Sequence, residues 1–230
     1  MSILILFVVS MAIGFLFADD VIRYLQAQPV AEPVHMVVID ITDAFKVYVY
    51  FAVIVGLVVT FPWALYQIWA FVKPGLTEKE RKVTLSYIPG AFVLSLAGLA
   101  FAYFLLFPFI VDFMISIAER VGAEEMYGMP QYFRFLFTFV LPFGLLFQMP
   151  LVILFLTRLE IITPILLKRM RKYAYFILFV LAALITPPEV LSHLLVTVPL
   201  IGLYEFSVAC ASFAYRKKQR TIHRVENNPP

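Results

Sequence analysis

Residues 47–72 read VYVYFAVIVGLVVTFPWALYQIWAFV, and residues 73–82 continue with KPGLTEKERK. The first stretch carries no acidic or basic side chain, and about 20 apolar residues are enough for a helix to cross a hydrocarbon core of about 30 Å. Its apolar residues are continuous rather than alternating, which favours a membrane-spanning helix over a barrel strand. The second stretch holds two acids among four bases. A carboxylate at such a boundary needs a physical reason.

The composition of the whole chain agrees with this first stretch. Of its 230 residues, 63% are hydrophobic and 14% are charged, whereas soluble domains have about 45–50% apolar and about 25% charged residues. So few polar side chains cannot cover the outside of a water-soluble fold. The composition therefore indicates an integral membrane protein. The single cysteine, Cys210, cannot form a disulfide within the chain.

Apolar runs recur along the sequence and predict an all-α polytopic fold with one membrane domain over residues 1–230. The fifth run is short, because 16 residues at about 1.5 Å each reach only about 24 Å. Prolines inside the other runs favour a curved bundle over a straight-walled one. The six expected spans and the basic tail are residues 3–18, 47–72, 83–111, 135–157, 173–188 and 190–215, followed by 216–230.

The basic residues are distributed unevenly among the connecting segments. Fourteen of the 18 lie between spans two and three, around the link between spans four and five, or after span six. The positive-inside rule then places both termini and these basic loops in the cytoplasm. Met1 leads almost directly into the first span. We expect that a cytoplasmic lead-in is missing from this sequence, because a secretory signal peptide would begin with a basic region and have a shorter apolar core.

Glu80 has two interpretations from its spacing. Thr77 and Glu80 have the separation of a capping box, in which Thr77 would cap the third span and Glu80 would reach back to its backbone N–H. Alternatively, the carboxylate accepts hydrogen bonds from a cation that a partner brings. An arginine can make such a contact bidentate and selective. The spacing alone leaves both interpretations open.

Two further polar side chains lie inside expected spans. Gln148, in the fourth span, predicts either a hydrogen bond between helices or a docking point for a polar group on another span. Pro150 supports both, because it removes the backbone donor for the carbonyl of Leu146. Glu205, in the sixth span, is a candidate functional acid that is either protonated or paired with a partner that the sequence does not identify.

The sequence lacks catalytic and metal-binding patterns. The spacing of the three histidines and the single cysteine matches no metal-site motif, and no nucleophile elbow or phosphate-binding loop is present. The bases lie at expected membrane edges, where lipid headgroups explain them better than nucleic acid does. We therefore expect a non-enzymatic membrane protein without cofactors. A small-solute channel or secondary transporter is one function that remains, and the lack of an internal repeat weighs against it.

The motifs taken together resemble one known family. From Pro62 to Arg81 the chain is similar to the first cytoplasmic loop of TatC, the multi-span signal-peptide receptor of the twin-arginine (Sec-independent) protein translocase. The resemblance continues in four further segments and covers nearly the whole chain in order. These segments are residues 100–104, 143–150, 186–189 and 199–205.

The resemblance implies roles for particular residues. Glu80 matches the glutamate that engages the arginine pair of a signal peptide, and Trp69, Phe71, Pro74 and Leu76 match loop residues around it. In the outer loops, Pro29 matches a proline that supports the cap, and Glu189 matches an acidic residue on the last turn. Gln148 and Glu205 match positions in the spans that are implied to dock partner helices.

The resemblance also implies a setting and partners. It implies a curved, glove-like bundle in the cell membrane that binds twin-arginine signal peptides of folded cargo and recruits single-span TatA-type subunits, with transport driven by the proton gradient. Homo-oligomers within the complex and contacts with membrane lipids are implied as well. The sequence departs from the family in two ways. Gln148 stands where many members have glutamate, and the initial cytoplasmic helix of the family is absent.

Overall fold

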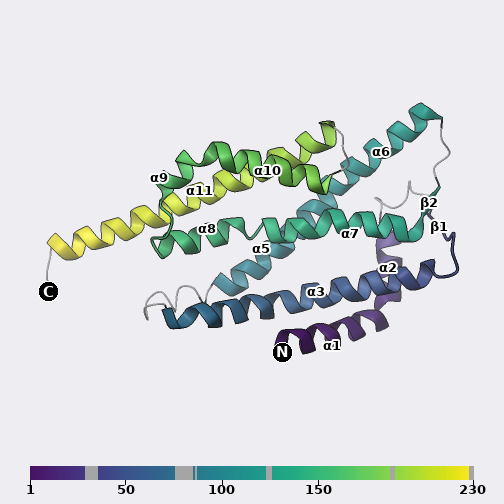
Figure 1. The fold of residues 1–230 in the computed structure, drawn as a ribbon, viewed down its shortest axis with the longest axis horizontal. Coiled ribbons are helices and arrows are strands. Elements are labelled where there is room, and N and C mark those ends of the chain that lie inside the picture. Colours follow the sequence, from purple (N-terminus) through teal and green to yellow (C-terminus); the bar gives the residue numbers. More distant parts are fainter. Residues whose placement is uncertain (29–35, 76–84, 86, 123–125, 187–189, 228–230) are drawn as a thin grey trace.

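The computed structural model describes residues 1–28, 36–75, 85, 87–122, 126–186 and 190–227. The described chain is almost entirely helical, and the long helices run side by side with their ends gathered at two opposite ends of the molecule (Figure 1). In chain order the elements are α1 (Ser2–Leu16), α2 (Ala18–Gln26), β1 (Met36–Val37), α3 (Asp43–Val72), the 3₁₀ turn η1 (Lys73–Gly75), α5 (Tyr87–Phe101), the π-helical turn η2 (Ala102–Leu106), α6 (Phe107–Val121), β2 (Tyr127–Gly128), α7 (Met129–Leu146), α8 (Met149–Arg158), α9 (Pro164–Arg169), α10 (Arg171–Ile185) and α11 (Val190–Asn227).

Four described helices or helix pairs are long and apolar enough to cross a membrane: Asp43–Val72, Tyr87–Arg120, Met129–Arg158 and Ser192–Arg216. A fifth candidate is α1 with α2, which bend by 61° relative to each other. The remaining span is the fifth expected one, which corresponds to α10, and its 15 residues reach only about 22 Å at 1.5 Å per residue. The all-α polytopic fold is thus confirmed, and the count of six spans stays a prediction.

The helices differ in extent from the apolar runs. The third span continues to Arg120, nine residues past the end of its apolar run, and α11 continues through the basic tail to Asn227. Charged residues at a helix end cost the helix nothing where they reach water, so charge marks the edge of the apolar layer and not the end of the helix.

Small residues allow α1 and α3 to pack closely. A Cβ atom added to Gly14 would lie 2.7 Å from Cβ of Val55, and one added to Gly56 would lie 3.0 Å from the ring of Phe7. Such contacts are possible only because both positions lack a side chain, as is usual between membrane helices.

Aromatic rings fill the centre of the bundle. Phe51 of α3 meets Phe133 of α7 with ring centroids 5.1 Å apart, and Phe139 meets Phe143 at 5.5 Å. Phe107 of α6 packs on Phe139 at 6.2 Å. All five rings are almost fully buried, so they anchor α3, α6 and α7 to one another.

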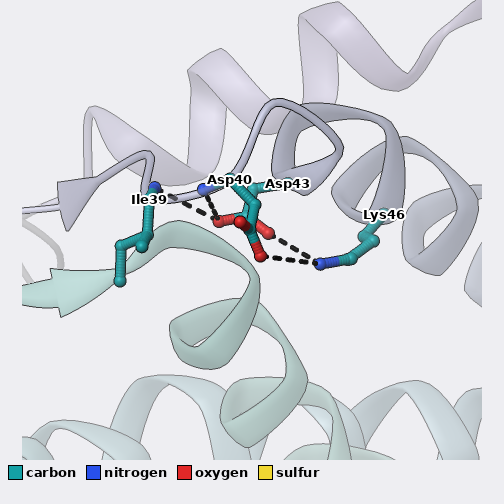
Figure 2. Close-up of polar contacts among 4 residues, drawn as sticks. All are labelled: Ile39, Asp40, Asp43 and Lys46. Carbon is teal, nitrogen blue, oxygen red and sulfur yellow. Dashed lines mark hydrogen bonds and ion pairs between the residues drawn. The ribbon is translucent and has the colours of Figure 1, made fainter.

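A small polar cap closes the end of the bundle opposite the basic segments. Strands β1 and β2 pair in parallel through Met36 with Tyr127 and Val37 with Gly128. Beside them, the Asp43 carboxylate accepts backbone N–H groups of Ile39 at 3.2 Å and Asp40 at 2.9 Å, and the Lys46 ammonium at 2.8 Å (Figure 2). Its side chain is 2% exposed, so these three donors are what make a buried carboxylate tolerable at the start of α3.

Candidate functional site

The C-terminal end of α3 carries the predicted signal-peptide residues that the structure describes. Phe71 is 86% exposed, and Pro74 lies just beyond it in η1. Trp69 stacks beside Tyr66 with ring centroids 5.9 Å apart, and the Lys73 ammonium lies 5.5 Å from its ring centroid. Glu80, Leu76, Pro29 and Glu189 lie outside the described residues.

Two apolar pockets follow α3 from this end toward the middle of the bundle. The first has a volume of about 150 Å³ and the second about 140 Å³. In each pocket, α3 forms one wall and α5 another, and the third wall is α8 in the first pocket and α7 in the second. The first is lined by Leu65, Ile68, Trp69, Val72, Tyr87, Ile88, Ala91, Leu151, Val152 and Phe155, and the second by Leu57, Val58, Phe61, Phe92, Ser95, Leu96, Leu99, Leu141, Gly144 and Leu145.

Gln148 lies at the break between α7 and α8. Pro150 has no N–H, so the helix cannot continue its usual pattern of bonds through this point. The N–H of Gln148 donates to the carbonyl of Leu145 at 2.9 Å, three residues back, instead of to that of Gly144. The fourth span is therefore two helices, and Gln148 is the residue that precedes the second.

The side-chain amide of Gln148 has hydrogen-bond partners for its donor group but not for its acceptor. Its Nε2 donates to the carbonyl of Ala91 on α5 at 2.9 Å and makes a longer contact with the carbonyl of Gly144 at 3.4 Å. Its Oε1 is buried and has no hydrogen-bond partner among the described residues. The predicted bond between helices is thus confirmed. Ala91 lines the first pocket and Gly144 the second, so the Nε2 group of Gln148 bonds to one wall residue of each pocket, although Gln148 itself lines neither.

Glu205 is held differently. Its carboxylate accepts Nη2 of Arg171 at 2.6 Å and the hydroxyl of Tyr175 at 2.6 Å, both on α10. The neighbouring Tyr204 hydroxyl donates to the carbonyl of Leu167 at 2.9 Å. Of the two states expected for Glu205, protonated or paired, the structure shows the pair, and its partner is Arg171. These bonds fasten α9 and the start of α10 to α11.

The sequence predicted bends at prolines, but it did not predict that the fourth span breaks into two helices after Leu146 or that the third span contains a π turn. At that turn the N–H of Phe107 donates to the carbonyl of Ala102, and Pro108 follows without an N–H of its own. The prolines at 108 and 150 were a usable signal, because each removes one helical bond. The partner of Gln148 was beyond reach, since Ala91 is 57 residues away in the sequence.

Comparison with known proteins agrees with this arrangement. Residues 1–199 match the family model described as TatC, Sec-independent protein translocase protein. The chain belongs to the TatC family. It is 52% identical over 218 residues to the Sec-independent protein translocase protein TatC of Halalkalibacterium halodurans, an alignment that covers 95% of this chain and 86% of the relative. It is 54% identical over 215 residues to TatCy of Bacillus subtilis, covering 94% and 85%.

A solved structure matches the TatC-family fold of this chain. The crystal structure titled as the twin arginine translocase receptor TatC superposes with a TM-score of 0.80 at 30% identity, covering 92% of this chain and 94% of the other. The names of the relatives describe a transport role. The matches give no support to the alternative of a small-solute channel or secondary transporter.

Proposed function

We propose that this chain is the receptor and scaffold subunit of a twin-arginine translocase. It would bind the signal peptides of folded proteins and recruit single-span TatA-type subunits, for export driven by the proton gradient. The observation that carries the proposal is the match of nearly the whole chain to translocase relatives and to the TatC receptor fold. Its basic segments then face the cytoplasm and its β1–β2 cap faces outward from the cell membrane.

Signal-peptide recognition is assigned to the boundary after α3. An exposed Phe71 and the apolar pocket beside Trp69 offer contacts for an apolar segment, and Glu80 follows within the same basic loop. A carboxylate and a guanidinium at about 4 Å attract each other by about 4 kcal/mol at an effective dielectric near 20. The net gain after desolvation is about 1–3 kcal/mol. Arginine is favoured over lysine because its planar fork binds a carboxylate bidentately.

Partner docking is assigned to Gln148. A buried acceptor without a donor costs about 1–3 kcal/mol, and a polar group on an incoming membrane helix would remove that cost. Because the Nε2 donor is already engaged by Ala91 and Gly144, the incoming group has to be a hydrogen-bond donor such as an amide or a hydroxyl. Docking by Glu205, assembly into homo-oligomers, and outer-loop roles for Pro29 and Glu189 belong to the same proposal.

The experiment that tests recognition is photo-crosslinking of a twin-arginine signal peptide to the reconstituted chain. Glu80→Gln keeps a polar side chain and removes the charge, and we expect crosslinking to fall about tenfold. Glu78→Gln, two residues earlier in the same loop, is the matched control and should leave it unchanged.

A lysine-pair peptide completes the test. It should crosslink about tenfold less than the arginine-pair peptide to the unsubstituted chain. With Glu80→Gln the two peptides should crosslink equally weakly. Full crosslinking to Glu80→Gln, or an undiminished preference for the arginine pair, would reject Glu80 as the recognition residue.

A further inference from the structure

The segment between α8 and α10 presents apolar side chains that the bundle does not cover. We call residues 161–173 the α9 corner. Ile161, Ile165, Leu166, Met170 and Tyr173 are all exposed there, Ile165 to 76%. Large aliphatic side chains at such exposure on a short connecting helix are costly in water, and a group of them marks a surface that contacts something apolar.

The α9 corner is fixed from the inside. Pro164 and Leu167 are buried against the bundle, and the carbonyl of Leu167 accepts the Tyr204 hydroxyl at 2.9 Å. Thr163 caps the helix by accepting the N–H of Leu166 at 3.3 Å. Glu160, with φ of 59°, makes the turn that leads into it. The exposed residues therefore form a defined surface with a fixed orientation.

Basic side chains are interleaved with these apolar ones. Lys168, Arg169 and Lys172 are exposed, and among the described residues no carboxylate lies within ion-pair distance of them. Arg171, in the same run, is instead paired with Glu205 at 2.6 Å. Glu160 is the only acid in the sequence from Arg158 to Lys172, so the surface carries a net positive charge.

The position of the α9 corner identifies the environment that suits both kinds of side chain. It lies at the end of the bundle where α3 and α8 also end (Figure 1), which is where the apolar spans stop. At this depth aliphatic and tyrosine side chains reach the acyl boundary while ammonium and guanidinium groups reach the phosphate layer. The positive-inside rule accounts for the basic residues alone. It does not account for the exposed Ile161, Ile165 and Tyr173, whereas contact with lipid accounts for both kinds of side chain.

We propose that the α9 corner is a binding surface for anionic phospholipid headgroups. Lys168, Arg169 and Lys172 contact the phosphates, and the exposed apolar residues hold the corner at the acyl boundary. The Glu205–Arg171 pair and the Tyr204 bond keep the surface aligned with the spans. Because α10 begins within the corner, bound lipid sets the depth at which this short helix enters the membrane.

The test measures lipids that stay bound to the purified chain, by native mass spectrometry after release from mixed phosphatidylglycerol and phosphatidylcholine nanodiscs. The triple variant Lys168→Gln, Arg169→Gln, Lys172→Gln is compared with Arg23→Gln, Arg120→Gln, Arg134→Gln, which removes three exposed bases at the opposite end. Each base near an anionic surface contributes about fivefold in binding. We expect the corner variant to lose selectivity for phosphatidylglycerol at least tenfold and the control variant to keep it.

Two further measurements make the outcome decisive. Raising the salt concentration should reduce the selectivity of the unsubstituted chain, because partly exposed charges are screened, and Ile165→Ser with Tyr173→Ser should lower retention of both lipids. Equal selectivity in the corner variant and the unsubstituted chain would overturn the proposal. So would a corner variant that keeps its lipid selectivity but no longer binds a TatA-type subunit, which would make the surface a protein interface. Unfolding temperatures within a few degrees of each other establish that all variants are folded.

Discussion

The break in the fourth span and the hairpin of α10 and α11 each place a polar side chain within an apolar run, but they satisfy it differently. Glu205 uses both carboxylate oxygens within the chain, on Arg171 and Tyr175. Gln148 uses only its donor, and its buried acceptor has no partner among the described residues. A saturated group holds helices together, whereas a half-used group in a low-dielectric site favours an incoming partner. The two positions look alike in the sequence and differ only in what surrounds them.

The largest effect is expected where packing sets the position of Gln148. A Cβ added to Gly98 of α5 would lie 2.6 Å from the carbonyl oxygen of Phe143 and 2.7 Å from the ring of Phe147. Gly98→Ala must therefore push α5 away from α7 and lengthen the bond from Gln148 to Ala91. We expect a loss of about 1–3 kcal/mol, measured by thermal unfolding in detergent.

Gly202 provides the matched control for that substitution. A Cβ at Gly202 of α11 would meet nothing within 4 Å, so Gly202→Ala should be neutral or slightly stabilising, because alanine favours a helix over glycine by about 1 kcal/mol. Equal unfolding temperatures for the Gly98→Ala and Gly202→Ala chains would show that the close approach of α5 and α7 does not matter.

A smaller effect is expected in the saturated cluster. Glu205→Leu leaves the guanidinium of Arg171 and the hydroxyl of Tyr175 without their acceptor. The Arg171 and Glu205 side chains are 41% and 35% exposed, and water screens them, so we expect a loss of only about 1–2 kcal/mol.

A double-mutant cycle separates this pair from general effects of the substitutions. Arg171→Leu combined with Glu205→Leu should destabilise the chain by less than the sum of the two single changes, because the second change removes a group that the first has already left unpaired. Strict additivity in the unfolding free energies would mean that the contact contributes nothing to stability.

The sequence predicted much of this architecture, for identifiable reasons. Charge-free runs locate spans because charged side chains are costly in lipid, and α3 and α7 with α8 were found in this way. The 61° bend after Leu16 could not be found, because Phe17 and Ala18 continue an apolar pattern and only tertiary packing decides the angle. The extension of α6 to Val121 was missed because helices do not end where charge begins.

The candidate site was predictable only in part. Phe71, Pro74 and Trp69 were placed at the end of a span by a local motif, and the structure puts them there. Pairing was one of the two states expected for Glu205, but the sequence did not identify the partner, because Arg171 lies 34 residues away. Such contacts depend on which helices become neighbours, and neither periodicity nor charge patterning encodes that.

Replacing Gln148 itself should affect stability least. Gln148→Leu removes the bond to Ala91 but also removes the unpaired Oε1, and the two changes offset each other to within about 1 kcal/mol. Association with a partner helix is a separate quantity. There the substitution removes the acceptor on which the docking proposed at Gln148 depends.

The most direct test of docking at the unpaired Oε1 of Gln148 is co-purification of a TatA-type subunit with the Gln148→Leu chain. Signal-peptide crosslinking is followed in the same preparations. With Gln148→Leu we expect recovery of the subunit to fall about tenfold and signal-peptide crosslinking to stay unchanged. A subunit whose polar membrane residue is replaced by leucine should bind the unsubstituted and the Gln148→Leu chains equally weakly. Undiminished recovery of the unmodified subunit with Gln148→Leu would contradict the account.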